Sequence, residues 1–381
     1  MKKSMSLILA AAMTLSLAAC GGASAPATTA APATTAAPAT TAAPAATEAA
    51  TTAAPETTAA AAETKAPTPA GDGKVYKFKI GTITAPEHPT TISMNKFVKE
   101  VKERSGGRLD PELFIAEQLG TELTQLENIQ SGLQEVMVSS ADKFGNYDAD
   151  FNILGMAFAF ESKEHVAAFL DSELGQNMNQ QLIDNFGLRN MPAYFWKMPR
   201  ALLCKTPILT PDDLKGKKIR IPNIPIWEKN FTALGAVPVI IAYADLPMSL
   251  LTGVVDCAET TYETIYGMKL HEGGPCISMV DYAYPLEVMT VSETWWQQLP
   301  DDLKEIFTEC AKEAADAYYQ TNLDNWEVEK EKIIEEGGSF YEVDRQVWMD
   351  AVKPLAEQLN EEKFWATDGL YDKVQALIGT Y

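Results

Sequence analysis

The stretch from Asp212 to Thr261 constrains the fold more than any other part of the chain. Apolar residues alternate from Lys217 to Ile221, which indicates a half-buried strand, and Pro222 ends it because proline cannot donate to a strand ladder. The elements expected next are a helix over Ile224–Leu234, a strand over Val237–Ile241, a helix from Asp245 to Gly253 and a strand that begins at Val254. This order predicts a βαβ unit with a parallel sheet.

The N-terminal half of the globular region repeats the same alternation. Its expected elements are a strand over Val75–Thr82, a helix over Pro89–Arg104, a strand over Leu109–Ile115, a helix over Thr121–Gln130 and a strand over Leu133–Val138. We therefore expect an α/β fold with two lobes, each built on its own sheet.

Polar residues stand where the predicted strands end, and ligands of such sheets bind outside the carboxyl ends of the strands. Arg220 and Asn223 flank the end of one strand, and Glu259 and Thr260 lie near the end of another. We expect these four residues to face one crevice, although an arginine in this position could also be an ordinary surface residue. Arg200 precedes Arg220 by 20 positions, which suits two adjacent strands.

Two long segments near the C-terminus link the lobes in this interpretation. The range Met279–Ser292 is expected to be a strand that crosses back to the first lobe. An amphipathic helix is expected over Asp301–Glu336, and at 1.5 Å per residue it would be about 50 Å long. Because that exceeds the diameter of one lobe, we expect both lobes to share this helix.

The charge of the chain excludes one class of partner. The formal net charge is −21, from 31 Lys and Arg against 52 Asp and Glu. Nucleic-acid binding needs a basic footprint, so no nucleic-acid partner is expected. The average field also repels small anions, so a carboxylate could be held only by locally fixed donors such as arginines.

Motifs for cofactors, metals and catalysis do not occur in the sequence. It contains no GxGxxG, Walker A, HExxH or GxSxG motif and no zinc-type cysteine spacing. We therefore expect no cofactor, no metal site and no catalytic residues. Five cysteines are present, and for the four after Cys20 we favour buried free thiols over disulfides, although pairing cannot be read from the sequence.

The first 73 residues are expected to lie outside the folded part. Residues 1–20 have two lysines, an apolar core and a terminal Ala-Ala-Cys, which resembles a bacterial lipoprotein signal peptide with Cys20 as the lipidated residue. Two acyl chains would anchor the protein stably to a membrane. Residues 21–73 repeat Ala, Thr and Pro with almost no large apolar side chain, which predicts a disordered tether.

The motifs LKGKKIRIPN, FTALGAVPV and GVVDCAE, spread over residues 214–259, resemble those of the extracytoplasmic solute-binding proteins of TRAP transporters. The resemblance extends from about Lys74 to the C-terminus. It implies a two-lobed, periplasmic-binding-protein-like fold that closes on a small organic acid and delivers it to TRAP membrane permease subunits. In that family the arginine of the Lys-x-Arg-x-Pro motif clamps the ligand carboxylate, and here that residue is Arg220.

The resemblance also bears on other candidate ligand-binding residues. A second family arginine corresponds to Arg200, although Met198 and Pro199 replace the usual local pattern. Ser140 and Lys143 occupy the places of a glutamate and an arginine in sialic-acid-binding members, which argues against sialic acid. The remaining candidates for polar contacts are Asn223, Thr260 and Glu259. Trp196, Trp227 and Tyr243 are candidates for apolar walls, with a place in the core as the alternative for each, and His88 lies on a strand-end loop, where a capping role is the alternative.

The expected lobe boundaries follow from these assignments. Lobe I should comprise residues 74–197 and 286–325, and lobe II residues 198–285 and 326–381. Two other functions stay open at this point. A surface-anchored hydrolase could use paired carboxylates beside tryptophan, and the chain could instead be the binding subunit of an ABC transporter or a receptor.

Overall fold

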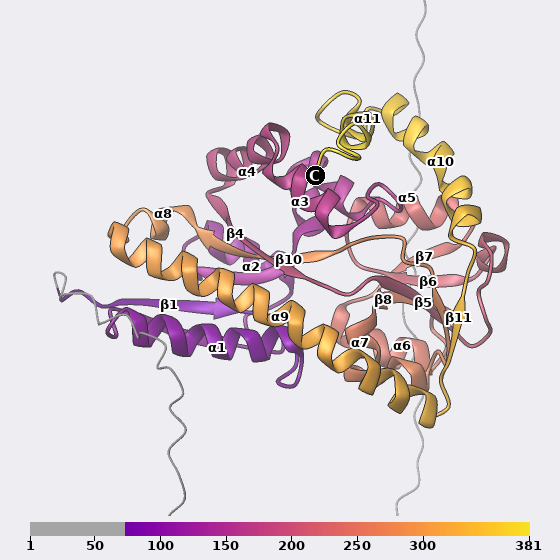
Figure 1. Cartoon of the computed structure of the whole chain (residues 1–381), viewed down its shortest axis with the longest axis horizontal. Helices are drawn as coiled ribbons and strands as arrows, with labels where there is room; N and C mark the ends of the chain where they lie inside the picture. The colour runs from indigo at the N-terminus through magenta and orange to yellow at the C-terminus, as the bar shows by residue number, and fades with distance from the viewer. Residues whose placement is uncertain (1–72) are drawn as a thin grey trace, which may run out of the picture. The chain divides into compact units, whose positions relative to one another are not determined.

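The computed structural model describes residues 73–381, and these residues form two β-sheets surrounded by helices (Figure 1). The strands are β1 (Tyr76–Gly81), β2 (Leu109–Phe114), β3 (Val136–Ser140), β4 (Leu188–Trp196), β5 (Arg200–Cys204), β6 (Lys218–Ile221), β7 (Val237–Ile240), β8 (Cys257–Thr261), β9 (Cys276–Met279), β10 (Leu286–Ser292) and β11 (Ser339–Glu342). The α-helices are α1 (Pro89–Arg104), α2 (Glu122–Gln130), α3 (Lys163–Asp171), α4 (Glu173–Phe186), α5 (Pro225–Ala233), α6 (Leu246–Leu251), α7 (Tyr262–Gly267), α8 (Glu293–Trp296), α9 (Asp301–Glu335), α10 (Arg345–Glu361) and α11 (Leu370–Gln375). Short 3-10 helices cover Ala141–Asn146, Ala149–Gly155, Pro211–Leu214, Tyr243–Asp245 and Leu270–Glu272.

The first sheet has the order β2-β1-β3-β10-β4. Strands β1, β2 and β3 are parallel, as the alternation of strands and helices predicts, whereas β10 runs antiparallel to both β3 and β4. Helix α1 begins at Pro89 directly after His88, whose side chain accepts a hydrogen bond from the backbone N–H of Thr90 and so caps the helix.

The second sheet has the order β11-β9-β5-β8-β6-β7. The predicted parallel unit is present, because β6 pairs in parallel with both β7 and β8. One expectation is wrong: the strands that carry Arg200 and Arg220 are not neighbours. Strand β8 lies between β5 and β6 and runs antiparallel to β5, so a distant segment fills the place expected for a direct pair.

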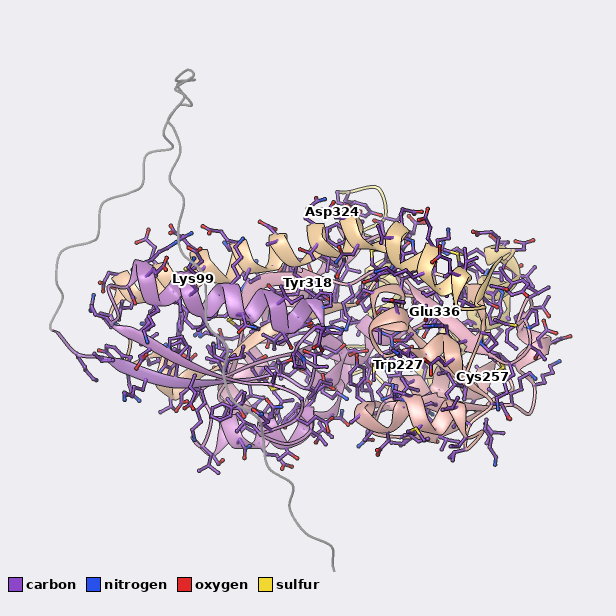
Figure 2. All side chains as sticks on the ribbon, turned by 90° about the horizontal axis from the view of Figure 1, so that it is seen from below. Lys99, Trp227, Cys257, Tyr318, Asp324 and Glu336 are labelled. Carbon is purple, nitrogen blue, oxygen red and sulfur yellow. A yellow bond between two sulfur atoms is a disulfide. The ribbon has the colours of Figure 1, made fainter. Side chains whose placement is uncertain are left out.

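Helix α9 takes part in the cores of both lobes, as its length predicts. Its first half contributes Leu303 and Phe307 to the core of the first sheet, where α1 packs alongside. Its second half contributes Trp326 and Ile333 to the core under β5, β8 and β9. Figure 2 shows the helix running from the side of α1 past Tyr318 to Glu336 in the other half of the folded region.

The expected single strand over Met279–Ser292 is wrong. The chain forms β9 up to Met279, leaves the second sheet, and enters the first sheet as β10 at Leu286. Asp281, with a φ of 51°, marks the change of direction between them. The segment therefore crosses between the lobes, but as two strands in two sheets.

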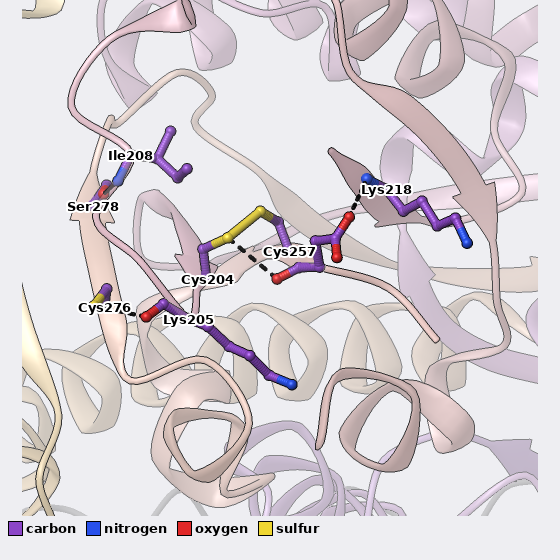
Figure 3. Close-up of a disulfide and its surroundings, with 8 residues drawn as sticks. Cys204, Lys205, Ile208, Lys218, Cys257, Cys276 and Ser278 are labelled. Carbon is purple, nitrogen blue, oxygen red and sulfur yellow. Dashed lines mark hydrogen bonds between the residues drawn. A yellow bond between two sulfur atoms is a disulfide. The ribbon is translucent and has the colours of Figure 1, made fainter. Parts of the chain in front are cut away.

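Two of the cysteines expected to be free are paired. Cys204 at the end of β5 and Cys257 at the start of β8 stand directly opposite each other in the antiparallel ladder and form a disulfide (Figure 3). The preference for free thiols is wrong for this pair, because the sheet order that places β8 beside β5 is invisible in the spacing of the cysteines. Cys276 and Cys310 are free thiols.

Several predictions lie outside the described residues or stay untested. Residues 1–72 contain the predicted signal peptide, Cys20 and almost all of the predicted tether. Among residues 73–381, no helix is sufficiently long and apolar to span a bilayer. The predicted lobe boundaries stay predictions, and α10 and α11 pack in a core that also contains residues from the N-terminal half, such as Ile153 and Phe158.

Candidate functional site

A cavity of about 270 Å³ lies where strand ends of both sheets meet. Thr84 follows β1, Ser140 ends β3, Asn223 follows β6, and Thr260 and Thr261 end β8. Strands β1 and β3 are parallel, and so are β6 and β8, so the carboxyl ends of each pair lie at one edge of their sheet. Ligands of parallel sheets bind at this edge.

Antiparallel strands bring further charged residues to the same edges. Arg200 begins β5 and pairs with Thr261 at the end of β8. Glu287, near the start of β10, pairs with Ser140 at the end of β3. The beginning of an antiparallel strand lies beside the end of its neighbour, so both charged side chains reach the cavity.

Arg220 is the cavity cation for which the described residues supply no carboxylate partner. Its side chain is buried, with 5% of the residue exposed, and its Nε donates a hydrogen bond of 3.0 Å to the Ile241 carbonyl. Among residues 73–381, its two terminal nitrogens donate no hydrogen bond and form no ion pair. Burial lowers the pKa of Arg220, an effect opposed by Glu259 and reinforced by Arg200. An incoming carboxylate would supply the missing counter-charge through two parallel hydrogen bonds.

Arg200 is already neutralised by a buried carboxylate. Its Nε and one terminal nitrogen lie 2.6 and 2.5 Å from the same oxygen of Glu259, which is fully buried. The Tyr282 hydroxyl donates to that oxygen at 2.7 Å. Burial lowers the pKa of Arg200, but the Glu259 charge outweighs this effect, so the pKa is raised overall.

The guanidinium of Arg200 also packs on an aromatic wall of the cavity. Its central carbon lies 4.6 Å from the ring centre of Trp227, in cation–π contact. The Trp227 Nε1 donates a 3.0 Å hydrogen bond to Asp142 in the 3-10 helix after β3. Trp227 sits on α5, so this bond links a helix of the second sheet to the 3-10 helix that follows the first sheet's β3.

Both lysines of the cavity are also paired. Lys143 lies 3.0 Å from Glu122, at the start of α2, and the other Glu122 oxygen accepts from the Ser140 backbone. Lys197, just after β4, lies 2.9 Å from Glu287. Burial lowers the pKa of Lys197, but Glu287 and other nearby acidic groups raise it well above its usual value.

Seven of the ten predicted ligand-binding residues line this cavity, and three do not. The lining residues are Ser140, Lys143, Arg200, Arg220, Asn223, Tyr243 and Thr260. Glu259 lies behind Arg200, and His88 is buried as the cap of α1. Trp196 ends β4 and packs edge-on against Tyr194 rather than at the cavity.

Several charged residues of the lining were not predicted from the sequence. Glu117, Glu122, Asp142, Lys197 and Glu287 all lie at the cavity. Asp142 and Lys197 could have been found from the same strand-end rule, because Asp142 lies two residues after β3 and Lys197 directly follows β4. Glu287 could not, because its place depends on β10 crossing into the first sheet.

Solved structures with the same fold define the class of protein. A TRAP periplasmic solute-binding protein from Ochrobacterium anthropi, solved with bound L-fuconate, matches at a TM-score of 0.72 and 28% identity over 80% of this chain and 99% of that one. One from Sulfitobacter sp. NAS-14.1, with bound β-D-galacturonate, matches at a TM-score of 0.73 and 22% identity, over 80% of this chain and all of that one. The fold is that of a two-lobed solute-binding protein.

Sequence comparison gives the family. Residues 80–363 match the DctP family of bacterial extracellular solute-binding proteins, family 7, and the chain belongs to this family. The C4-dicarboxylate-binding periplasmic protein DctP of Vibrio cholerae is 27% identical over 294 residues, which are 76% of this chain and 87% of that protein. The C4-dicarboxylate-binding protein DctB of Bacillus subtilis is 26% identical over 286 residues, which are 74% of this chain and 81% of that protein. The expected family and fold class are thereby confirmed.

Proposed function

We propose that this protein captures a small organic acid in the cavity between its sheets and delivers it to a TRAP-type membrane permease. Arg220 binds the acid's carboxylate, and Asn223 and Thr260 hydrogen-bond to neighbouring groups. Lobe closure brings Ser140 and Lys143 from the first sheet onto the same molecule. The observation that carries the proposal is the buried Arg220 guanidinium, which faces the cavity without a counter-ion among the described residues.

The names and bound ligands of the relatives support an acid as the ligand, although they point to different kinds of acid. Those from Vibrio cholerae and Bacillus subtilis are named for C4-dicarboxylates, whereas solved neighbours hold galacturonate or fuconate. All of these molecules carry a carboxylate. Binding without turnover suits a family of solute-binding proteins, and a hydrolytic role gains no support from these comparisons.

Isothermal titration calorimetry of the folded protein with C4-dicarboxylates, aldonates and uronates tests the proposal. We expect at least one acid to bind, and Arg220→Ala to weaken its affinity by about 100-fold or more, since the variant loses a desolvated, bidentate charge contact. Arg189→Gln is the matched control, because it removes an arginine that pairs with Glu293 away from the cavity. An acid that binds the wild type and Arg220→Ala equally well would refute the carboxylate contact.

We further propose that the protein works outside the cytoplasm as a lipoprotein, anchored through Cys20. The support is the sequence of residues 1–20 and the periplasmic naming of relatives. Metabolic labelling with a clickable fatty acid should mark the full-length protein, and Cys20→Ala should abolish the label and release the protein from membranes. Unchanged membrane association of that variant would contradict the anchor.

The permease partner is tested separately. Uptake of the bound acid into vesicles that contain a TRAP-type permease should require this protein and a sodium or proton gradient. Uptake that instead consumes ATP would favour an ABC transporter, the alternative that the sequence left open.

A further inference from the structure

The charges of the cavity lining carry an inference about the kind of acid that fits. Four cationic side chains line the cavity: Lys143, Lys197, Arg200 and Arg220. The first three are each in contact with a carboxylate, namely Glu122, Glu287 and Glu259. Within residues 73–381, Arg220 alone among the four lacks such a contact. The lining therefore offers one uncompensated positive charge.

The lining also contains carboxylates that belong to none of these ion pairs. Glu117 and Asp142 also line the cavity, and neither forms an ion pair among the described residues. Asp142 accepts a hydrogen bond from Trp227 with one oxygen, while its other oxygen is buried without a donor among those residues. A second carboxylate on the ligand would meet these groups without a cation of its own, and unpaired like charges at close range weaken binding.

The ion pairs suit hydroxyl groups better than carboxylates. A paired lysine keeps unused N–H donors, and a paired glutamate keeps unused lone pairs, so each pair presents donors and acceptors side by side. A hydroxyl both donates and accepts and can bond to both members of a pair without disturbing its charge balance. An ionised carboxylate only accepts, so it would be repelled by the glutamate of each pair.

We propose that this cavity selects acids with a single carboxylate and several hydroxyl groups, and discriminates against dicarboxylates. The inference rests on the proposed function, in which Arg220 holds the carboxylate. It adds that the hydroxylated end of the molecule lies against the Lys143–Glu122 and Lys197–Glu287 pairs. The Lys143–Glu122 pair comes from the first sheet's end and Arg220 from the second, so one molecule would bridge both sheets.

Matched ligand pairs test the inference on the wild-type protein. Threonate and tartrate share one carbon skeleton, and galactonate and galactarate share another; in each pair the second acid replaces a terminal hydroxymethyl group with a carboxylate. By calorimetry at neutral pH, we expect the monoacid of at least one pair to bind about 100-fold more tightly than its diacid, the cost of one unpaired buried charge. Succinate and malate, which also carry two carboxylates, should bind no better than tartrate and galactarate.

The possible results separate the two proposals. If a diacid of either pair, or succinate or malate, binds as tightly as the best monoacid and loses affinity in Arg220→Ala, the single-charge inference is overturned and the proposed function stands. If no acid in the calorimetric panel binds, the proposed function itself fails and the inference falls with it.

A charge-altering variant gives a second test that is insensitive to a general loss of affinity. Glu122→Gln frees Lys143 from its counter-ion and creates a second uncompensated cation. The ratio of monoacid to diacid affinity should then fall by about tenfold, since a second carboxylate gains a partner. Glu127→Gln is the matched control, because Glu127 lies exposed on the same helix outside the lining. An unchanged ratio in Glu122→Gln would contradict the role given to the Lys143–Glu122 pair.

Discussion

The buried contact between Arg200 and Glu259 gives a stability prediction that can be worked through from the structure. Glu259 is fully buried, and the Arg200 side chain is 11% exposed. Two nitrogens of Arg200 and the Tyr282 hydroxyl share one Glu259 oxygen. Removing the charge of Glu259 alone leaves the guanidinium buried without compensation, and such changes cost about 3–5 kcal/mol.

The size of the expected thermal shift follows from the size of the folded part. Unfolding entropy is about 2.1 cal/mol/K per residue, so about 300 folded residues give roughly 0.6 kcal/mol/K. A loss of about 4 kcal/mol then lowers Tm by roughly 6 °C. We expect this shift for Glu259→Gln, which keeps the shape of the side chain and an acceptor for Tyr282.

A double-mutant cycle separates the ion pair from other effects of the substitutions. Arg200→Met leaves the Glu259 carboxylate buried and unpaired, so it should also destabilise, whereas Arg200→Met with Glu259→Gln removes both charges and should recover about 2 kcal/mol or more. Urea unfolding followed by circular dichroism and by tryptophan fluorescence provides the free energies, provided that the two transitions coincide. A coupling energy below about 1 kcal/mol would refute the reasoning.

Three further predictions concern the disulfide and two titrating groups. Replacing Cys204 and Cys257 together by serine should lower the free energy of unfolding in urea by about 4 kcal/mol, because the bond closes a loop across 53 positions. Acid binding should persist, and loss of binding with intact stability would contradict this. Burial, followed by the charge of Lys197, lowers the pKa of His88 from 6.5 to about 3. As the pH drops from 6.5 towards 3, His88 therefore takes up a proton in the unfolded chain before it does so in the folded protein, and the stability of the wild type falls. His88→Asn keeps a cap acceptor and should lose less stability over that window; parallel curves would contradict the assignment. Burial, with a contribution from Glu263, raises the pKa of Glu329 from 4.5 to about 7, so its ionisation penalises the folded state as pH rises through that range, and Glu329→Gln should raise Tm at pH 8 but not at pH 4.

The parts of the fold that depend on local periodicity could be predicted from the sequence. Helix α1 has the predicted bounds, and β6, α5, β7 and β8 follow in the predicted order, because each element buries one face at its own repeat. The order of strands within a sheet depends on pairing between distant segments. This is why β8 was not expected between the strands of Arg200 and Arg220, and why the disulfide that this order permits was not expected either.

The same distinction separates the predicted part of the cavity from the rest. Arg220 and Asn223 could be placed at a crevice because a parallel strand ends beside them and ligands bind at such ends. Lys197 and Glu287 are 90 positions apart, and nothing in either local sequence indicates their contact. Among 52 acidic residues, those that neutralise cavity cations can be recognised only once the two sheets are in place.

Two of the three links between the sheets pass beside the cavity, at Lys197 and Glu287, which connects the proposed binding to the proposed closure. The chain leaves the first sheet at Lys197, and the Lys197 backbone donates to Pro285, just before β10 returns to that sheet. The third link is α9, where the Tyr318 hydroxyl reaches Glu263 at the start of α7. A molecule bound between Arg220 and the ion pairs would therefore contact residues next to the crossing strands. Rotation of one lobe at these crossings would change the distance between the end of β3 and the end of β6, so a ligand that contacts both ends would stabilise the closed arrangement by the difference in its contacts.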